Sequence, residues 1–128
     1  MKFIVNSKKE TIDEDAGILY LVLFHLDGKD LVKIGITTRK IEDRISEILV
    51  SIFKVYRVFP YTRPKRFKQT TNILEKEACL HNYFKKYNYK PAKVFSGSTE
   101  FFDIPLEAAV IAYERLLAGE SLSEGGYG

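Results

Sequence analysis

The stretch GILYLVLFHLDGKDLVKIGIT, residues 17–37, decides how this chain folds. Two apolar runs, residues 18–24 and 31–36, flank the polar segment DGKD at residues 27–30, which is the pattern of two strands joined by a tight turn. Runs that are apolar on both faces belong in the middle of a sheet. The predicted fold is therefore an α/β domain of the α+β type, with a small central antiparallel sheet built on this hairpin and about three helices around it.

The turn also determines which residues of the hairpin lie opposite each other. Its centre is expected between Gly28 and Lys29. The expected cross-strand pairs are Tyr20 with Thr37, Val22 with Gly35, and Phe24 with Lys33. Side chains alternate between the faces of a strand, so Tyr20, Lys33 and Gly35 should share one face. A phenol, an ammonium group and a glycine gap on one surface indicate a site rather than a core.

These residues also carry a family resemblance. Gly17, Tyr20, the segment KIG at residues 33–35 and Arg44 on the next helix form an ordered set that resembles the GIY-YIG nuclease superfamily, in the phage-type branch where lysine replaces the second tyrosine. Together with later motifs, the resemblance covers residues 17–102 and implies a GIY-YIG-like fold. Two features depart from the pattern: GILY has one residue more than GIY, and Ile48 stands where many relatives have histidine or tyrosine.

Length and composition bound the class of protein. With 128 residues, 45% hydrophobic and 29% charged, the chain is expected to form one domain over residues 1–128, with an N-terminal arm at 1–16 and a flexible tail at 121–128. No apolar run reaches the ~20 residues of a membrane span, and the start has no signal-peptide core, so a soluble, cytoplasmic protein without a membrane partner is expected. One cysteine and two histidines exclude an internal disulfide and a closed zinc site.

Charge is distributed unevenly along the chain. The net charge is +3, but residues 48–99 hold eleven lysines and arginines against two acids, and acids dominate afterwards. Such a stretch favours binding to the phosphates of a nucleic acid, and a solvated lysine-rich surface is the alternative. The residues expected to contact nucleic acid are Thr37, Arg57, Arg63, Lys65, Arg66, Lys68, Lys85 and Lys86.

A helix should follow the hairpin. Isoleucines recur at helical spacing over residues 41–48, Thr37 or Thr38 can serve as N-cap, and the helix is expected to end near Ser51.

A strand and a loop are predicted next. Residues 53–61, FKVYRVFPY, alternate aromatic residues and valine with basic residues, which predicts a third strand with one solvent-exposed face. Residues 62–72, TRPKRFKQTTN, have the composition of a basic surface loop, in which an aromatic side chain can stack on a base.

Arg44 is the informative residue on this helix. It borders the buried stripe, whereas Glu42 and Glu47 belong to the face expected to be solvated. Either its stem lies along apolar surface and its charge reaches water, or the guanidinium binds an anion. The resemblance assigns this arginine to the scissile phosphate, which a planar fork of donors can bind through two oxygens.

A second helix is predicted at about residues 71–87, with Glu77 on its buried side one turn before His81. A buried carboxylate needs a cation, an arginine or a proton, so a salt bridge to Arg44 or Lys33 is the structural alternative to a functional role. Glu77, His81 and Phe84 match an E-x-x-x-H-x-x-F element of the phage-type branch, which implies that Glu77 binds a divalent ion. His81 is either a hydrogen-bonded core histidine or a proton-transfer group.

Residues 92–104 are expected to form a short strand or hairpin that turns at residues 96–98. The segment GSTEFF at residues 97–102 resembles the last element of the family pattern, with Glu100 in a supporting role. Pro105 should open a final helix that runs through Ala118 and covers the other face of the sheet. Apolar side chains of this helix that stay exposed could form a dimer contact.

Together these residues predict a metal-dependent endonuclease. Hydrolysis of a phosphodiester needs a base for water, positive charge over the phosphoryl oxygens and a Lewis acid. Tyr20 is the candidate base or water-positioning group, with Lys33 lowering its pKa or holding the water. Arg44 would bind the phosphate, and Glu77 would hold Mg²⁺ or Mn²⁺.

The expected substrate is DNA, cut with low sequence specificity or by structure, with RNA not excluded and with a homodimer or a separate specificity partner as further options. The alternative is a catalytically silent nucleic-acid-binding or protein-interaction module on the same fold.

Overall fold

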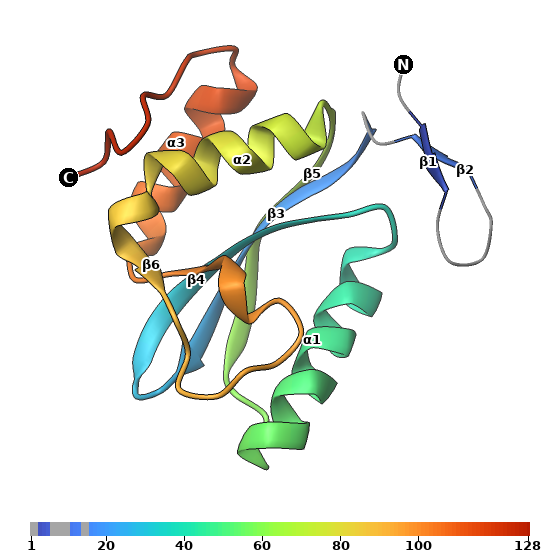
Figure 1. Ribbon diagram of the computed structural model, residues 1–128, viewed down its shortest axis with the longest axis vertical. Coiled ribbons are helices and arrows are strands. Elements are labelled where there is room, and N and C mark those ends of the chain that lie inside the picture. The colour runs from blue at the N-terminus through green and yellow to red at the C-terminus, as the bar shows by residue number, and fades with distance from the viewer. Residues whose placement is uncertain (1–2, 6–10, 14–15) are drawn as a thin grey trace.

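The computed structural model describes residues 3–5, 11–13 and 16–128. At its centre lies a five-stranded antiparallel sheet with the strand order β5-β3-β4-β7-β6 (Figure 1). Helix α1 packs on one face of the sheet, and α2 and α3 pack on the other. The predicted α+β class with a central antiparallel sheet is therefore confirmed.

The bounds of the elements are as follows. The central strands are β3 (Ala16–Leu26), β4 (Lys29–Thr37), β5 (Thr62–Thr71), β6 (Asn88–Tyr89) and β7 (Phe101–Phe102). The helices are α1 (Ile41–Tyr56), α2 (Ile73–Tyr83) and α3 (Leu106–Leu117), with short 3-10 turns at Lys85–Tyr87 and Ser98–Glu100. Within the predicted N-terminal arm, β1 (Phe3–Val5) pairs with β2 (Thr11–Asp13) in a separate two-stranded sheet. No helix of the described residues is both long and apolar enough to cross a bilayer.

The β3–β4 hairpin has a different register from the predicted one. Its turn residues are Asp27 and Gly28, with φ of 53° and 77°, and the turn is closed by Leu26 opposite Lys29. The observed pairs are Tyr20 with Gly35, Val22 with Lys33, and Phe24 with Leu31. The predicted pairs were wrong because Asp-Gly suits a tight two-residue turn with positive φ at both positions. A slip of two residues preserves the faces, so Tyr20, Lys33 and Gly35 do share one face.

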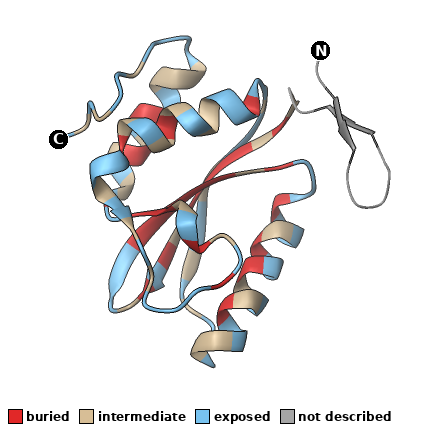
Figure 2. Cartoon of the chain, in the orientation of Figure 1, coloured by how far each residue is buried: buried red, intermediate tan, exposed pale blue. Residues whose placement is uncertain are grey.

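Two cores lie on the two faces of the hairpin. Leu19, Leu21 and Ile34 pack against α2 and α3, whereas Tyr20 and Val22 pack against α1. Figure 2 shows the buried residues following β3 and β4 and the inner side of α1. A hairpin buried on both faces explains why its sequence is apolar without alternation.

Helix α1 is longer than predicted. Ile52 is fully buried and continues its apolar stripe past Ser51, and the helix ends where Arg57 takes a left-handed conformation. The strand predicted at residues 53–61 was therefore wrong: residues 53–56 belong to α1, residues 57–61 form a connection, and the next strand begins at Thr62. The predicted N-cap was also wrong: Lys40 precedes the helix, and Thr37 Oγ1 instead accepts a hydrogen bond from the Arg39 N–H at 3.1 Å.

Strand β5 replaces the loop predicted at residues 62–72. It lies at the edge of the sheet, and its register against β3 shifts between Leu21 and Val22. Pro64 pairs with Val22 at this irregularity, the kind of position where a sheet tolerates proline. The edge position also explains the polar sequence, because much of the strand faces water.

The C-terminal third holds one confirmed helix and several differences. Helix α3 occupies the predicted span. Helix α2 ends at Tyr83, earlier than expected, and the 3-10 turn Lys85–Tyr87 follows it. Residues 92–104 form a loop, the turn at residues 98–100 and the two-residue strand β7 instead of a hairpin of their own.

The tail predicted to be flexible at residues 121–128 instead packs on α2. The Gly125 N–H donates to the Asn82 carbonyl at 2.7 Å, and the Tyr127 ring lies 5.0 Å from that of Phe84. The Tyr127 ring packs against apolar side chains and holds this segment in place. The glycine-rich composition of the segment did not indicate this contact.

Candidate active site

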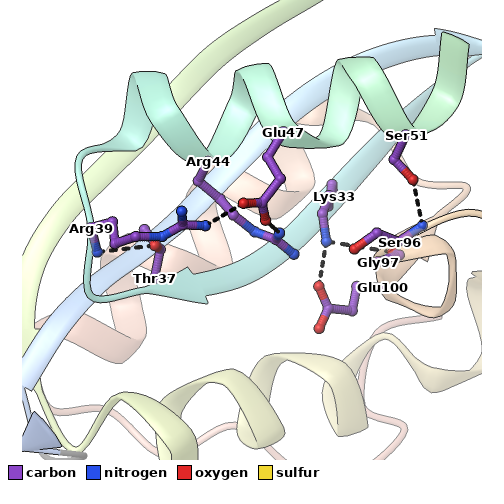
Figure 3. A network of polar contacts seen from close by, with 9 residues as sticks. All are labelled: Lys33, Thr37, Arg39, Arg44, Glu47, Ser51, Ser96, Gly97 and Glu100. Atoms are coloured by element: carbon purple, nitrogen blue, oxygen red, sulfur yellow. Dashed lines mark hydrogen bonds and ion pairs between the residues drawn. The ribbon is translucent and has the colours of Figure 1, made fainter. Parts of the chain in front are cut away.

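Lys33 lies at the centre of the site. It is fully buried on β4, and its ammonium group donates to the Glu100 carboxylate and, at 3.4 Å, to the Gly97 carbonyl (Figure 3). Burial lowers the pKa of Lys33, and the Glu100 charge opposes this effect. Glu100 is thus the ion-pair partner of a buried lysine, and its supporting role in the site stays a prediction.

Tyr20 lies beside Lys33 on the same face. The Lys33 Nζ is 5.7 Å from the centre of the Tyr20 ring. A Cβ atom on Gly35 would lie 2.5 Å from the Tyr20 hydroxyl oxygen, so the glycine leaves room for the ring. Burial raises the pKa of Tyr20 to about 12, although the Arg44 guanidinium lowers it in part. Tyr20 is therefore a neutral phenol at physiological pH, and the expectation that Lys33 lowers its pKa was wrong.

Arg44 reaches the same region from α1. Its side chain is only 17% exposed, and it donates to the Glu47 carboxylate. Glu47 also accepts a hydrogen bond of 2.7 Å from Arg39. Glu47 is exposed like Glu42, as expected, and one turn of helix also places its carboxylate beside Arg44.

Gly97 brings the loop before β7 against both cations. A Cβ atom on Gly97 would lie 2.8 Å from Lys33 Nζ and 3.6 Å from Arg44 Nη2, and the residue has a φ of +83°. The positive φ favours glycine here. The close approach shows that Lys33 and Arg44 meet under one loop.

Glu77 faces inward from α2, as predicted. Its Oε2 atom is buried and has no hydrogen-bond partner among the described residues. Burial raises the pKa of Glu77 to about 7, with repulsion from Glu100 as a second cause and attraction to Lys33 opposing both. In the part of the chain that the structure describes, Glu77 forms no ion pair with Arg44 or Lys33, so the predicted structural alternative is not observed.

His81 holds the edge of β4. Its Nε2 lies 2.8 Å from the Ile34 carbonyl oxygen, to which it donates, and its ring meets Phe102 edge to face. Strand β7 pairs with β4 only at Val32 and Lys33, so His81 supplies a partner one residue past this pairing. This contact is that of the hydrogen-bonded structural histidine, one of the two roles that the sequence left open.

An open cleft adjoins the site. It is lined by Ile36, Thr37, Thr38, Arg39, Arg44 and Ile73. Thr37 is thus the one member of the predicted nucleic-acid set that lines this cleft. Arg39 and Glu47 were not among the predicted site residues. Arg39 lies in the turn before α1 and Glu47 lies about two turns further on, and no sequence periodicity relates these two positions.

The other predicted nucleic-acid contacts lie elsewhere. Arg63, Lys65 and Arg66 line a groove against α3, on the sheet face opposite Tyr20. Arg66 is paired there with Glu114 at 2.9 Å. Lys68 is exposed on the same strand, Arg57 ends α1, and Lys85 and Lys86 follow α2.

The residues present fit a metal ion with few protein ligands. No group of three or more histidine, cysteine, aspartate or glutamate side chains gathers within the described residues. Glu77 offers one buried carboxylate oxygen without a partner. Mg²⁺ commonly keeps several waters and binds through one or two carboxylates.

The fold and these side chains define a small α+β domain that gathers a phenol, two cations and a buried carboxylate around a central hairpin. Residues 17–117 match the T5orf172 domain, and the chain belongs to the T5orf172 domain family. This phage-associated domain occurs in some nuclease contexts, which relates the chain broadly to nucleases without specifying the GIY-YIG superfamily. No curated protein and no solved structure matches the chain.

Proposed function

We propose that this protein is a metal-dependent endonuclease of the GIY-YIG type that hydrolyses phosphodiester bonds of DNA. One observation carries the proposal: Tyr20 Oη, beside Arg44, and Glu77 Oε2, near Lys33, are buried polar atoms for which no hydrogen bond of good geometry is found among the described residues. A buried polar atom without a partner is costly and calls for an explanation. A bound phosphate, a water and a cation would satisfy both atoms.

Each side chain has a role in this proposal. Arg44 binds the phosphoryl group, because a guanidinium can donate two parallel hydrogen bonds to two of its oxygens. Tyr20 positions the attacking water as a neutral phenol, which its pKa of about 12 favours over action as a phenolate base. Lys33 adds positive charge near the phosphoryl group, and Glu100 keeps its ammonium group in place.

Glu77 is the residue that would hold Mg²⁺ or Mn²⁺. When bound, the ion would act as a Lewis acid that stabilises charge on the leaving oxygen. A cation would also remove the cost of ionising a carboxyl group whose pKa burial has raised to about 7. His81 supports this arrangement from one turn further along α2 through its contact with β4.

The test is incubation with supercoiled plasmid, branched DNA and RNA, each with and without Mg²⁺ or Mn²⁺. We expect cleavage of DNA that requires the metal and that Glu77→Gln and Arg44→Ala abolish. Absence of cleavage of every substrate with either metal would defeat the proposal.

A silent binding module is the second candidate, and one contact favours it. The Lys33 ammonium group is already neutralised by Glu100, as it would be in a purely structural pair. Binding of DNA without turnover would support this candidate.

A further inference from the structure

Two arginines and one carboxylate form a cluster at the mouth of the candidate active site. Arg39 precedes α1, and Arg44 and Glu47 lie on it. The Glu47 carboxylate accepts a hydrogen bond through Oε2 from Arg39 Nη2 at 2.7 Å and through Oε1 from Arg44 Nη1. Figure 3 shows both guanidinium groups directed at this one carboxylate.

Glu47 is the member of the cluster that can leave. Its side chain is 45% exposed and that of Arg39 is 55% exposed, whereas that of Arg44 is only 17% exposed. Exposed ion pairs add little to stability, because water solvates both groups when they separate. Because the Arg44 side chain is mostly buried, we expect it to keep its position if Glu47 turns outward.

The two arginines present the donors that a phosphate group binds. A guanidinium fork matches the two oxygens of a carboxylate or of a phosphodiester, and here two forks share one anion. Both arginines line the open cleft described above, so a phosphate can approach them from solvent. The hydrogen bond from the Arg39 N–H to Thr37 Oγ1 fixes the turn that carries Arg39.

We propose that the Glu47 carboxylate holds the place of a DNA phosphate between Arg39 and Arg44 and moves aside when a strand binds. Arg39 is then a second phosphate-binding residue. Glu47 is a positioning residue that keeps both guanidinium groups aimed at the cleft and competes with anions that bind weakly. The inference rests on the proposed function for its class of ligand, but it concerns binding and not cleavage.

The test measures binding of a short fluorescein-labelled DNA duplex in EDTA, so that no metal-dependent cleavage takes place. Glu47→Gln removes one negative charge and the competition for both arginines. Glu42→Gln removes the same charge from an exposed position of the same helix that forms no ion pair among the described residues, which makes it the matched control. We expect the Kd to fall roughly three- to tenfold in Glu47→Gln and by less than about twofold in Glu42→Gln.

Arg39 is tested through its charge and its shape. Arg39→Ala should raise the Kd and reduce the slope of log Kd against log salt by about one, as expected for one lost phosphate contact. Arg39→Lys should restore the slope but only part of the affinity, because an ammonium group cannot bind two oxygens as a fork. Glu47→Gln should lower the Kd less in the Arg39→Ala background than in wild type, because only one arginine is then released.

Equal affinities of Glu47→Gln and Glu42→Gln would overturn the proposal, as would an unchanged salt slope in Arg39→Ala or a lack of DNA binding by both wild type and Glu47→Gln. The result is independent of catalysis. A protein that shows these binding effects without cutting any substrate would refute the proposed nuclease function and leave the phosphate site standing.

Discussion

At the scale of single residues, Tyr20 and Glu77 carry polar atoms that the fold buries and leaves without partners in the described part of the chain. Each such atom costs about 1–3 kcal/mol relative to a hydrogen-bonded one. Positively charged neighbours distinguish both residues from ordinary core residues, since Arg44 lies beside Tyr20 and Lys33 lies near both. A bound ligand could supply hydrogen-bond or ionic partners to these two atoms and so remove their cost to stability.

Glu77 makes stability depend on pH. Its pKa is raised from 4.5 to about 7, so the folded protein holds a proton that the unfolded chain releases near pH 4.5. The contribution of Glu77 to stability is therefore fully present below about pH 4.5 and is lost as the pH rises through about 7. We expect the melting temperature of metal-free wild type to fall, relative to Glu77→Gln, between about pH 5 and about pH 8. Parallel melting temperatures would show that Glu77 is solvated.

Metal binding at Glu77 is tested with the same pair of proteins. At about pH 8, Mn²⁺ should raise the melting temperature of wild type but not of Glu77→Gln, because only the carboxylate can bind it. Cleavage by Glu77→Gln should fall by several orders of magnitude, while DNA affinity stays similar or rises through lost repulsion. A variant that melts much earlier than wild type without metal, beside a wild type that Mn²⁺ does not stabilise, would refute the ligand role.

Gly35 is the second residue whose identity the site depends on. In Gly35→Ala the new Cβ would lie 2.5 Å from the Tyr20 ring and hydroxyl, and both residues are buried. Overpacking of this kind costs about 1–3 kcal/mol, which urea unfolding can measure. Gly128→Ala, whose Cβ would meet nothing nearer than the Lys86 Nζ at 3.4 Å, is the control and should change stability by less than about 0.5 kcal/mol. Equal stabilities would mean that Tyr20 can move without cost.

At the scale of secondary-structure elements, β5 depends on a contact that joins it to β3 and α3. The Tyr113 hydroxyl donates to the Leu19 carbonyl at 2.6 Å and accepts from the Lys68 N–H at 3.0 Å. It therefore ties the edge strand to its neighbour from a buried position on α3. This contact adds to the pairing of β5 with β3 and helps to hold a sequence with little apolar pattern in the sheet.

Tyr113→Phe should weaken β5 in particular. The change leaves a buried carbonyl and an amide without this partner, which costs about 1–3 kcal/mol. Amide hydrogen exchange should accelerate in β5 more than in β4. Tyr61→Phe, at a side chain that is 61% exposed, is the control and should alter neither quantity. Unchanged exchange in β5 would show that backbone pairing with β3 suffices.

At the scale of the whole molecule, the sequence predicted those features that depend on burial. The hairpin, the shared face of Tyr20 and Lys33, and the inward Glu77 all follow from apolar periodicity, and they survive a two-residue error in register. The same reasoning could not find β5, because an edge strand in water needs no apolar face. It also could not find the pairing of Glu47, which depends on how the turn at Arg39 folds back over α1.

The central sheet also separates the basic residues around it into two groups. Arg39 and Arg44 lie on the face that carries α1, whereas Lys65 and Arg66 line the groove against α3 on the opposite face. DNA bound at the candidate site should therefore contact the first pair directly and the second pair only through long-range charge. Arg44→Ala should reduce the slope of log Kd against log salt by about one, whereas Lys65→Ala combined with Arg66→Ala should leave the slope unchanged. A reduced slope in the double variant would mean that DNA crosses the β5 edge and contacts both faces of the sheet.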